Sequence, residues 1–164
     1  MNKQPTLFES QSRADFSACR NYRFTLWRVW GDASNYVQFI GLNPSTADET
    51  NDDATIRRCR NFAKSWGFGA MCMTNLFAFR ATDPNVMKKA QNPVGEENDE
   101  WLLKIAGSAK LIVAAWGNHG NHLGRDAKVI KLLNRPLHCF EVSKQNQPKH
   151  PVRLRSDLKP ILYI

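Results

Sequence analysis

The sequence predicts an α/β fold, a three-layer sandwich whose mainly parallel central sheet begins with an N-terminal hairpin. Segments typical of strands and of helices alternate after residue 42, as they do when crossover helices join parallel strands. The runs 70–76 and 111–116 have no polar face, which is expected of strands covered on both sides. The 164 residues suffice for one sizeable core, and we expect a polar N-terminal segment over 1–20 and a single α/β domain over 21–164.

Two strands are expected at the start of the sheet. Residues 23–30 alternate between apolar and polar side chains with period two, as in a half-buried strand. Gly31 and Asp32 are typical turn residues, and residues 36–42 form a second apolar run. The two runs are therefore predicted to pair as a hairpin.

The first helix is expected to follow Asp52 and Asp53, whose carboxylates can cap its N-terminus. Apolar residues recur at helical spacing over 56–66, and Gly67 ends the pattern. At Asp83-Pro84, a capping side chain precedes a proline at the first helical position. The remaining expected elements are strands over 70–76, 110–116 and 137–142 and helices over 96–106 and 124–133.

The chain is basic, with a net charge of +8 and a pI near 9.6. Positive charge is concentrated in residues 57–60 and 144–159. A small basic domain is typical of proteins that bind nucleic acid or phosphorylated ligands. The charge therefore favours nucleic acid or a nucleotide as the partner.

The composition argues against several other classes of protein. No apolar run approaches a membrane span and residues 1–5 lack a signal-peptide core, so we expect a cytoplasmic protein with no membrane partner. The four cysteines lie far apart, which favours reduced thiols over a zinc or iron–sulfur site. His119 and His122 have no third ligand nearby in the sequence, and no Gly-x-Gly-x-x-Gly or Walker-type loop occurs. We therefore expect no metal and no cofactor.

Polar residues gather where the predicted strands end. Four segments rich in Asn, His, Arg and hydroxyl side chains follow these strands, at 43–46, 75–84, 116–120 and 143–151. Ligands of open α/β sheets bind outside the carboxyl ends of parallel strands, and those ends share one edge. We therefore expect the four segments to form one site.

Several of these residues also have purely structural interpretations. Asn43 can form a turn before the following proline, and Asp52 and Asp53 can be helix caps instead of catalytic groups. Arg80 can be a surface side chain or can hold a phosphate or carboxylate. Asn75 ends an apolar strand, where an amide is costly to bury unless it is bonded, and this favours a functional role.

The four segments, in this order, resemble the uracil-DNA glycosylase superfamily. The string Gly41-Leu42-Asn43-Pro44 is similar to its first motif, Thr74-Asn75 with the following Arg80 to its second, and His150-Pro151 to its last. The resemblance covers roughly residues 36–154 and implies an α/β sandwich with a central parallel sheet.

The segment from Gly41 to Asp48, together with Trp116-Gly117-Asn118-His119-Gly120, looks like a family of bacterial and phage proteins catalogued only as a domain of unknown function. That resemblance covers most of the chain and implies no established activity. The segment after Pro44 differs from that of the well-known uracil glycosylases, and Val152 stands where many members have serine. These differences favour a different or modified base over uracil.

The glycosylase resemblance implies hydrolysis of an N-glycosidic bond. In that chemistry Asn43, Asp48 or Asp52 would position the attacking water, and His150 would donate a hydrogen bond to the leaving base. Asn75 would bind the edge of the base, and an aromatic such as Phe77 or Phe79 would lie under it. Substrate contacts are expected from Pro44, Ser45, Thr46, Arg80, Trp116, Asn118 and His119, and nucleic-acid backbone contacts from Arg57, Arg58, Lys149, Arg153 and Arg155.

Three functions are compatible with the sequence. The first is an enzyme that cleaves an N-glycosidic bond in nucleic acid or in a free nucleotide. The second is a different enzyme that processes a modified nucleotide in the same pocket, and the third is a binding module without chemistry. All three require Asn43, Asn75, His119 and His150 to converge on one pocket.

Overall fold

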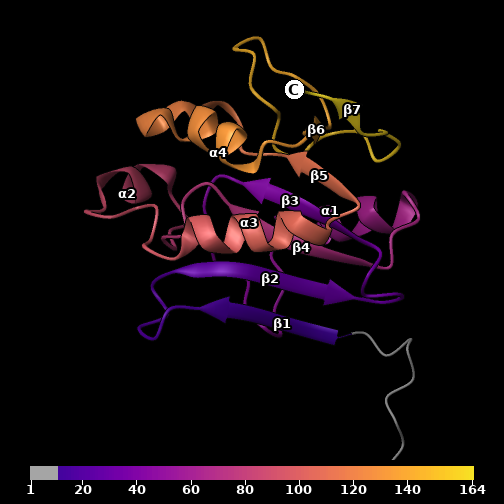
Figure 1. Ribbon diagram of the computed structural model, residues 1–164, viewed down its shortest axis with the longest axis horizontal. Helices are drawn as coiled ribbons and strands as arrows, with labels where there is room; N and C mark the ends of the chain where they lie inside the picture. Colours follow the sequence, from indigo (N-terminus) through magenta and orange to yellow (C-terminus); the bar gives the residue numbers. More distant parts are fainter. Residues whose placement is uncertain (1–10) are drawn as a thin grey trace, which may run out of the picture.

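The computed structural model describes residues 11–164 and contains a seven-stranded sheet with four α-helices in that range (Figure 1). The strands are β1 Gln11–Phe16, β2 Arg23–Val29, β3 Tyr36–Gly41, β4 Ala70–Asn75, β5 Leu111–Ala114, β6 His138–Cys139 and β7 Ile161–Leu162. The helices are α1 Ala54–Ser65, α2 Pro84–Lys89, α3 Asn98–Ser108 and α4 Arg125–Leu133, and a 3₁₀ segment, Asn118–Gly124, precedes α4.

The sheet is mixed, with the strand order β1-β2-β4-β3-β5-β6-β7. The strands β4, β3, β5 and β6 are parallel, whereas the pairs β1–β2, β2–β4 and β6–β7 are antiparallel. The α/β class is confirmed, but the expectation of a mainly parallel sheet is wrong because antiparallel strands extend it at both edges. The three strands that precede the polar loops, β3, β4 and β5, are nevertheless parallel to one another.

The expected hairpin between residues 23–30 and 36–42 is wrong, because β4 lies between β2 and β3. The chain after β2 crosses the start of β4, where the backbone N–H groups of Trp30 and Gly31 donate to the carbonyl of Gly69 at 3.0 and 2.8 Å. A Cβ at Gly69 would lie 2.4 Å from the backbone nitrogen of Asp32, so this close crossing requires glycine. The hairpin in the structure instead joins β1 and β2.

Helices cover both faces of the sheet, which gives three layers. Helix α1 packs one face with Ile56, Cys59 and Phe62, while α3 and α4 pack the other with buried residues that include Leu102 and Val129. In Figure 1, α3 lies in front of the sheet and α1 behind it. The apolar periodicity of each helix thus faces the sheet, as amphipathic helices require.

The two predicted helix starts are confirmed. Asp53 caps α1, since its Oδ1 accepts a hydrogen bond from the backbone N–H of Ile56 at 2.9 Å. Asp83 caps α2 in the same way, and Pro84 occupies the first turn. These starts depend only on neighbouring residues, which explains why a local pattern could identify them.

Part of the expected polar segment over 1–20 is ordered as strand β1, at the edge of the sheet. Residues 1–10 lie outside the described residues. The expected strand over 137–142 is shorter, because β6 spans His138–Cys139 and pairs with β7 beyond it. None of the helices in the described part of the chain has the length and apolarity needed to cross a bilayer.

The four cysteines are free thiols, of which Cys19 is exposed and the others are buried. Burial raises the pKa of the Cys59 and Cys72 thiols far above the usual range. These two groups are therefore protonated core side chains and not nucleophiles.

Candidate functional site

A cavity of about 540 Å³ opens at the carboxyl ends of β3, β4 and β5. Its walls are formed by the residues that follow these strands, by the start of α1 and by His150. The chain leaves β3 toward α1 on one face and leaves β5 toward α4 on the other. Open α/β sheets bind their ligands at such a point, and the volume is typical of small-molecule sites, which measure about 300–1,000 Å³.

The four residues that were expected to converge, Asn43, Asn75, His119 and His150, all line this cavity. Asn75 is the last residue of β4, and Asn43, His119 and His150 come from three different loops, of which the first two follow β3 and β5. The parallel pairing of β3 with β4 and β5 brings these loops to one edge. Other predicted substrate-binding residues on its walls are Pro44, Ser45, Trp116 and Asn118.

Asn43 holds the loop after β3 in place. Its Nδ2 donates to the carbonyl of Ala81 at 2.8 Å and to that of Pro44 at 3.2 Å. The backbone N–H of Ala81 donates back to the carbonyl of Pro44 at 2.9 Å. Asn43 therefore both forms the expected turn and lines the cavity. Its Nδ2 is hydrogen-bonded to backbone carbonyls, whereas its Oδ1 receives no hydrogen bond from residues 11–164.

Asn75 ends β4 opposite Gly41 of β3. The residue is 3% exposed, and its Nδ2 has no hydrogen-bond partner among the described residues. Only a glycine at position 41 leaves room for this amide, because a Cβ there would lie 2.8 Å from Oδ1 of Asn75. A buried unpaired donor costs about 1–3 kcal/mol, and a ligand acceptor in the cavity would complete it.

His150 lies at the rim of the cavity. Its Nε2 is 3.3 Å from Oγ1 of Thr55, and the backbone N–H of Val152 donates to its Nδ1 at 3.3 Å. Because Nδ1 accepts, the neutral ring carries its proton on Nε2. The residue is exposed as a whole, but its ring is partly desolvated by the surrounding loops. This desolvation lowers the pKa of His150, and the Asp53 carboxylate partly offsets the effect. His150 therefore offers an Nε2–H donor at neutral pH.

We expect acid to destabilise the protein partly through His150. Because burial lowers the pKa of His150 in the folded state, the unfolded chain takes up this proton first, and the stability contributed by the neutral ring is lost as the pH falls below about 6.5. The free energy of unfolding, measured with urea above and below this pH, should fall less in His150→Gln than in the wild type. An equal loss in both proteins would contradict the lowered pKa.

Asp48 lies outside the cavity and closes a turn. Its Oδ1 accepts hydrogen bonds from the backbone N–H groups of Thr50 and Asn51 at 3.0 and 2.8 Å, and these bonds lower its pKa to about 2. A carboxylate with so low a pKa is a poor proton acceptor. The predicted catalytic role of Asp48 is therefore replaced by a structural one.

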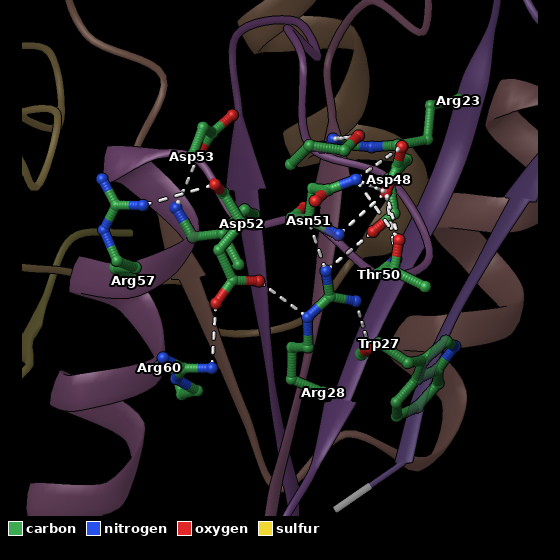
Figure 2. Close-up of polar contacts among 12 residues, drawn as sticks. Arg23, Trp27, Arg28, Asp48, Thr50, Asn51, Asp52, Asp53, Arg57 and Arg60 are labelled. Carbon is green, nitrogen blue, oxygen red and sulfur yellow. Dashed lines mark hydrogen bonds and ion pairs between the residues drawn. The ribbon is translucent and has the colours of Figure 1, made fainter.

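Asp52 and Asp53 have different environments, as Figure 2 shows. Asp52 points to Arg28 and Arg60, with an N–O distance of 2.8 Å to each, and so ties α1 to β2 outside the cavity. Asp53 points away from these arginines and lines the cavity. Among residues 11–164, Asp53 supplies the carboxylate of the cavity wall, whereas the sequence favoured a cap at this position and Asp48 and Asp52 as the catalytic carboxylates.

Arg23 also lines the cavity and was not predicted from the sequence. It begins β2 and is 2% exposed; its Nη1 donates to the carbonyl of Ala47 at 3.0 Å. Burial lowers its pKa to about 10, so the guanidinium is charged at neutral pH. In the sequence, Arg23 could be noticed only as an arginine at the start of a predicted strand. An arginine on the exposed face of a half-buried strand gives the same pattern, so the sequence could not identify it as a cavity residue.

Phe77 does not line the cavity. It is fully buried and packs on His122 in the core beside α3 and α4, so the expectation that it lies under a base is not met. Trp116 is also buried, but it does line the cavity, and its Nε1 donates to Oε1 of Gln147 at 2.9 Å.

Thr46 and Arg80 line a neighbouring groove of about 450 Å³. The groove adjoins the cavity, because Ser45 belongs to the walls of both. Arg80 donates from Nη1 to the carbonyl of Arg20 at 3.1 Å, and its guanidinium lies 4.9 Å from the ring centre of Phe16. These two predicted substrate-binding residues are therefore beside the cavity and not in it.

Asn118 and His119 form the exposed wall after β5. Oδ1 of Asn118 accepts a hydrogen bond from Oγ of Ser143 at 2.6 Å, and Nδ1 of His119 lies 2.8 Å from Nζ of Lys88. Within residues 11–164, no group of three or more His, Cys, Asp or Glu side chains could hold a metal ion.

Of the basic residues expected to contact a nucleic-acid backbone, four bond within the chain. Arg57 donates to the carbonyl of Asp52 at 3.3 Å, and Arg58 donates to backbone carbonyls at 151 and 154. Lys149 pairs with Glu141 at 3.1 Å, and Arg155 pairs with Asp157 at 2.8 Å. Because Arg57, Arg153 and Arg155 are exposed, the predicted phosphate contacts rest mainly on these three side chains.

A family model described as "Protein of unknown function (DUF1643)" matches residues 23–152. The matched range begins at Arg23 and ends just after His150, so it contains every residue that lines the cavity. No curated protein and no solved structure matches the chain significantly. Because the model covers well over half of the 164 residues, the chain belongs to the DUF1643 family.

Proposed function

We propose that the protein is an enzyme that hydrolyses the N-glycosidic bond of an unusual or modified base, in nucleic acid or in a free nucleotide. The observation that carries the proposal is the meeting of Asn43, Asp53, Asn75 and His150 around one cavity at the ends of parallel strands. The order of the corresponding loops along the chain also resembles the uracil-DNA glycosylase superfamily.

Cleavage of an N-glycosidic bond develops positive charge on the sugar and requires a water molecule beside it. Asn43 and Asp53 both line the cavity, and Oδ1 of Asn43 and the carboxylate of Asp53 are hydrogen-bond acceptors. We assign to them the positioning of this water, and to the Asp53 carboxylate the stabilisation of the developing charge. Asp53 takes the role first expected of Asp48 or Asp52.

The leaving base develops negative charge during the same step. The Asn75 amide carries both a donor and an acceptor, and its Nδ2 has no partner among residues 11–164, which suits it to bind the edge of a base. The Nε2–H of His150 would donate to the base oxygen on which the anion grows. The neutral ring can serve this role because Val152 donates to its Nδ1, which leaves the proton on Nε2.

A binding module without chemistry is the second candidate. Asp53 caps α1, and Nδ2 of Asn43 is bonded to the carbonyl of Ala81. Both side chains thus have structural roles that require no reaction. In this reading Asn75 and His150 recognise a ligand, and nothing is cleaved.

The test is the release of free base from oligonucleotides and free nucleotides that carry unusual bases, followed by mass spectrometry. We expect release by the wild type and a loss of about 100-fold or more in His150→Ala, because removing one hydrogen-bond donor to a developing anion typically costs about 10²–10³-fold. His122→Ala is the matched control, since His122 lies outside the cavity and its replacement should leave the rate unchanged.

Three outcomes separate the candidates. Release that depends on His150 supports the glycosidic-bond enzyme. If every tested base stays attached while DNA binding depends steeply on salt, the binding module is correct. Binding of a mononucleotide but not of a polymer would favour an enzyme that processes free nucleotides.

A further inference from the structure

Arg23 is the permanently charged cation of the cavity wall. It is 2% exposed, and two apolar residues that line the same cavity, Ile56 and Met73, are 1% and 2% exposed. A guanidinium has five N–H donors. Within residues 11–164, its hydrogen bonding consists of the Nη1 contact with the carbonyl of Ala47 at 3.0 Å, and its Nε is buried without a partner.

The other two buried arginines in the described range differ from Arg23 in one respect. Arg28 and Arg125 are each 4% exposed, and each contacts a carboxylate, Asp52 at 2.8 Å and Asp99 at 2.6 Å. None of the ion pairs within residues 11–164 includes Arg23. Because an unpaired buried charge is costly, this exception requires a physical reason.

The charged groups around Arg23 do not supply that reason. Asp53 is the neighbouring carboxylate that favours its charge, and it acts without direct contact. Arg28 and Arg80 are near enough to oppose the charge. This wall of the cavity therefore has positive charge that no contact within the described chain neutralises.

We propose that Arg23 is the anion-binding residue of the cavity and that the ligand carries an oxyanion, a phosphate or a carboxylate, which pairs with this guanidinium. Both groups present oxygens that match the planar fork of arginine. The inference rests on the proposed function only in placing a ligand in this cavity. The inference adds that this ligand carries a negative charge. Hydrolysis of the N-glycosidic bond does not itself depend on that charge.

The depth of Arg23 also restricts how the oxyanion is attached. An internal phosphodiester continues into chain on both sides, whereas Arg23 itself is only 2% exposed, and Ile56 and Met73 of the same cavity are equally buried. A group that reaches Arg23 must therefore end the ligand. The class that fits is a small molecule with a terminal phosphate or carboxylate, and an internal phosphate of a strand does not fit this position.

The experiment compares thermal unfolding of the full chain in inorganic phosphate, acetate and chloride at equal ionic strength. We expect phosphate or acetate to raise the Tm of the wild type above that in chloride by about 2 °C or more. Arg23→Met should abolish this rise. Lys128→Met removes the same charge from an exposed position of α4 and should retain it.

The stability of Arg23→Met in chloride is a second measurement, which shows whether a variant that binds no anion is still folded. In chloride this variant should be at least as stable as the wild type, because it removes an unpaired buried charge. Arg28→Met, which breaks the contact with Asp52, should unfold at a clearly lower temperature. If Arg23→Met does not fold in chloride, the expectation about its stability is wrong and Arg23 has a structural role.

The two oxyanions distinguish the sources of the charge. A response to phosphate alone assigns a phosphate, and a response to acetate alone assigns a carboxylate. The inference is overturned if neither anion raises the Tm, or if Arg23→Met responds as the wild type does. Base release does not enter this measurement, so a protein that releases no base can still meet the expectation, and one that releases base can still fail it.

Discussion

Replacing Asp53 by asparagine should lower the rate of base release by about 100-fold or more and change the free energy of unfolding by only about 1 kcal/mol or less. Asparagine caps helices as well as aspartate does, so the backbone N–H of Ile56 keeps an acceptor at the start of α1. The carboxylate that we assign to water positioning is lost. Base release and urea unfolding of the same preparation measure the two effects.

Asp52→Asn is the matched control, at the adjacent residue. It weakens the contacts with Arg28 and Arg60, and since Arg28 is buried, we expect a loss of about 3 kcal/mol of stability. The folded fraction should retain its rate, because Asp52 lies outside the cavity. If instead Asp52→Asn abolishes release and Asp53→Asn does not, the assignment of Asp53 is wrong.

Asn75→Leu should abolish base release and ligand binding without loss of stability. The substitution removes a buried donor that has no partner in the described part of the chain, and this is expected to raise the free energy of unfolding by about 1 kcal/mol. Function is lost because leucine offers neither the donor nor the acceptor of the amide. Calorimetric titration and urea unfolding measure the two quantities.

The same substitution at Asn98 provides the contrast. Asn98 is fully buried, and its Nδ2 donates to the carbonyls of Asn75 and Leu76 at 3.0 and 3.1 Å. Asn98→Leu should therefore cost about 1–3 kcal/mol. If Asn75→Leu destabilises the protein as much as Asn98→Leu does, the Asn75 amide is a structural group, and its place in the candidate site must be given up.

The helices could be predicted from the sequence because their signals are local. Asp53 and Asp83 cap the first turns that follow them, and the apolar residues of α1 recur with the period of the helix that they build. The order of the strands could not be predicted in the same way. β4 separates β2 from β3 because the chain crosses at Gly69, and this contact joins residues far apart in the sequence.

The candidate site shows the same division. Asn43, Asn75 and His119 follow strands of parallel type, and the rule that such strands share an edge was enough to bring them together. Asp52 and Asp53 are adjacent and chemically identical, so nothing in the sequence could tell which one faces the cavity. Phe77 presented the same difficulty, because an apolar residue after a strand suits a core as well as a ligand site.

The sequence by itself therefore determined the α/β class, the helix starts and the loops that carry polar groups, since all of these depend on side chains within a few residues of one another. Only the tertiary structure decided which polar groups lack a partner. Arg23 and Arg28 belong to the same strand and are buried to a similar degree, yet within residues 11–164 Arg28 contacts a carboxylate and Arg23 does not. Whether a buried charge is satisfied depends on segments that meet through folding, and for that reason the cavity residue Arg23 could be identified only in three dimensions.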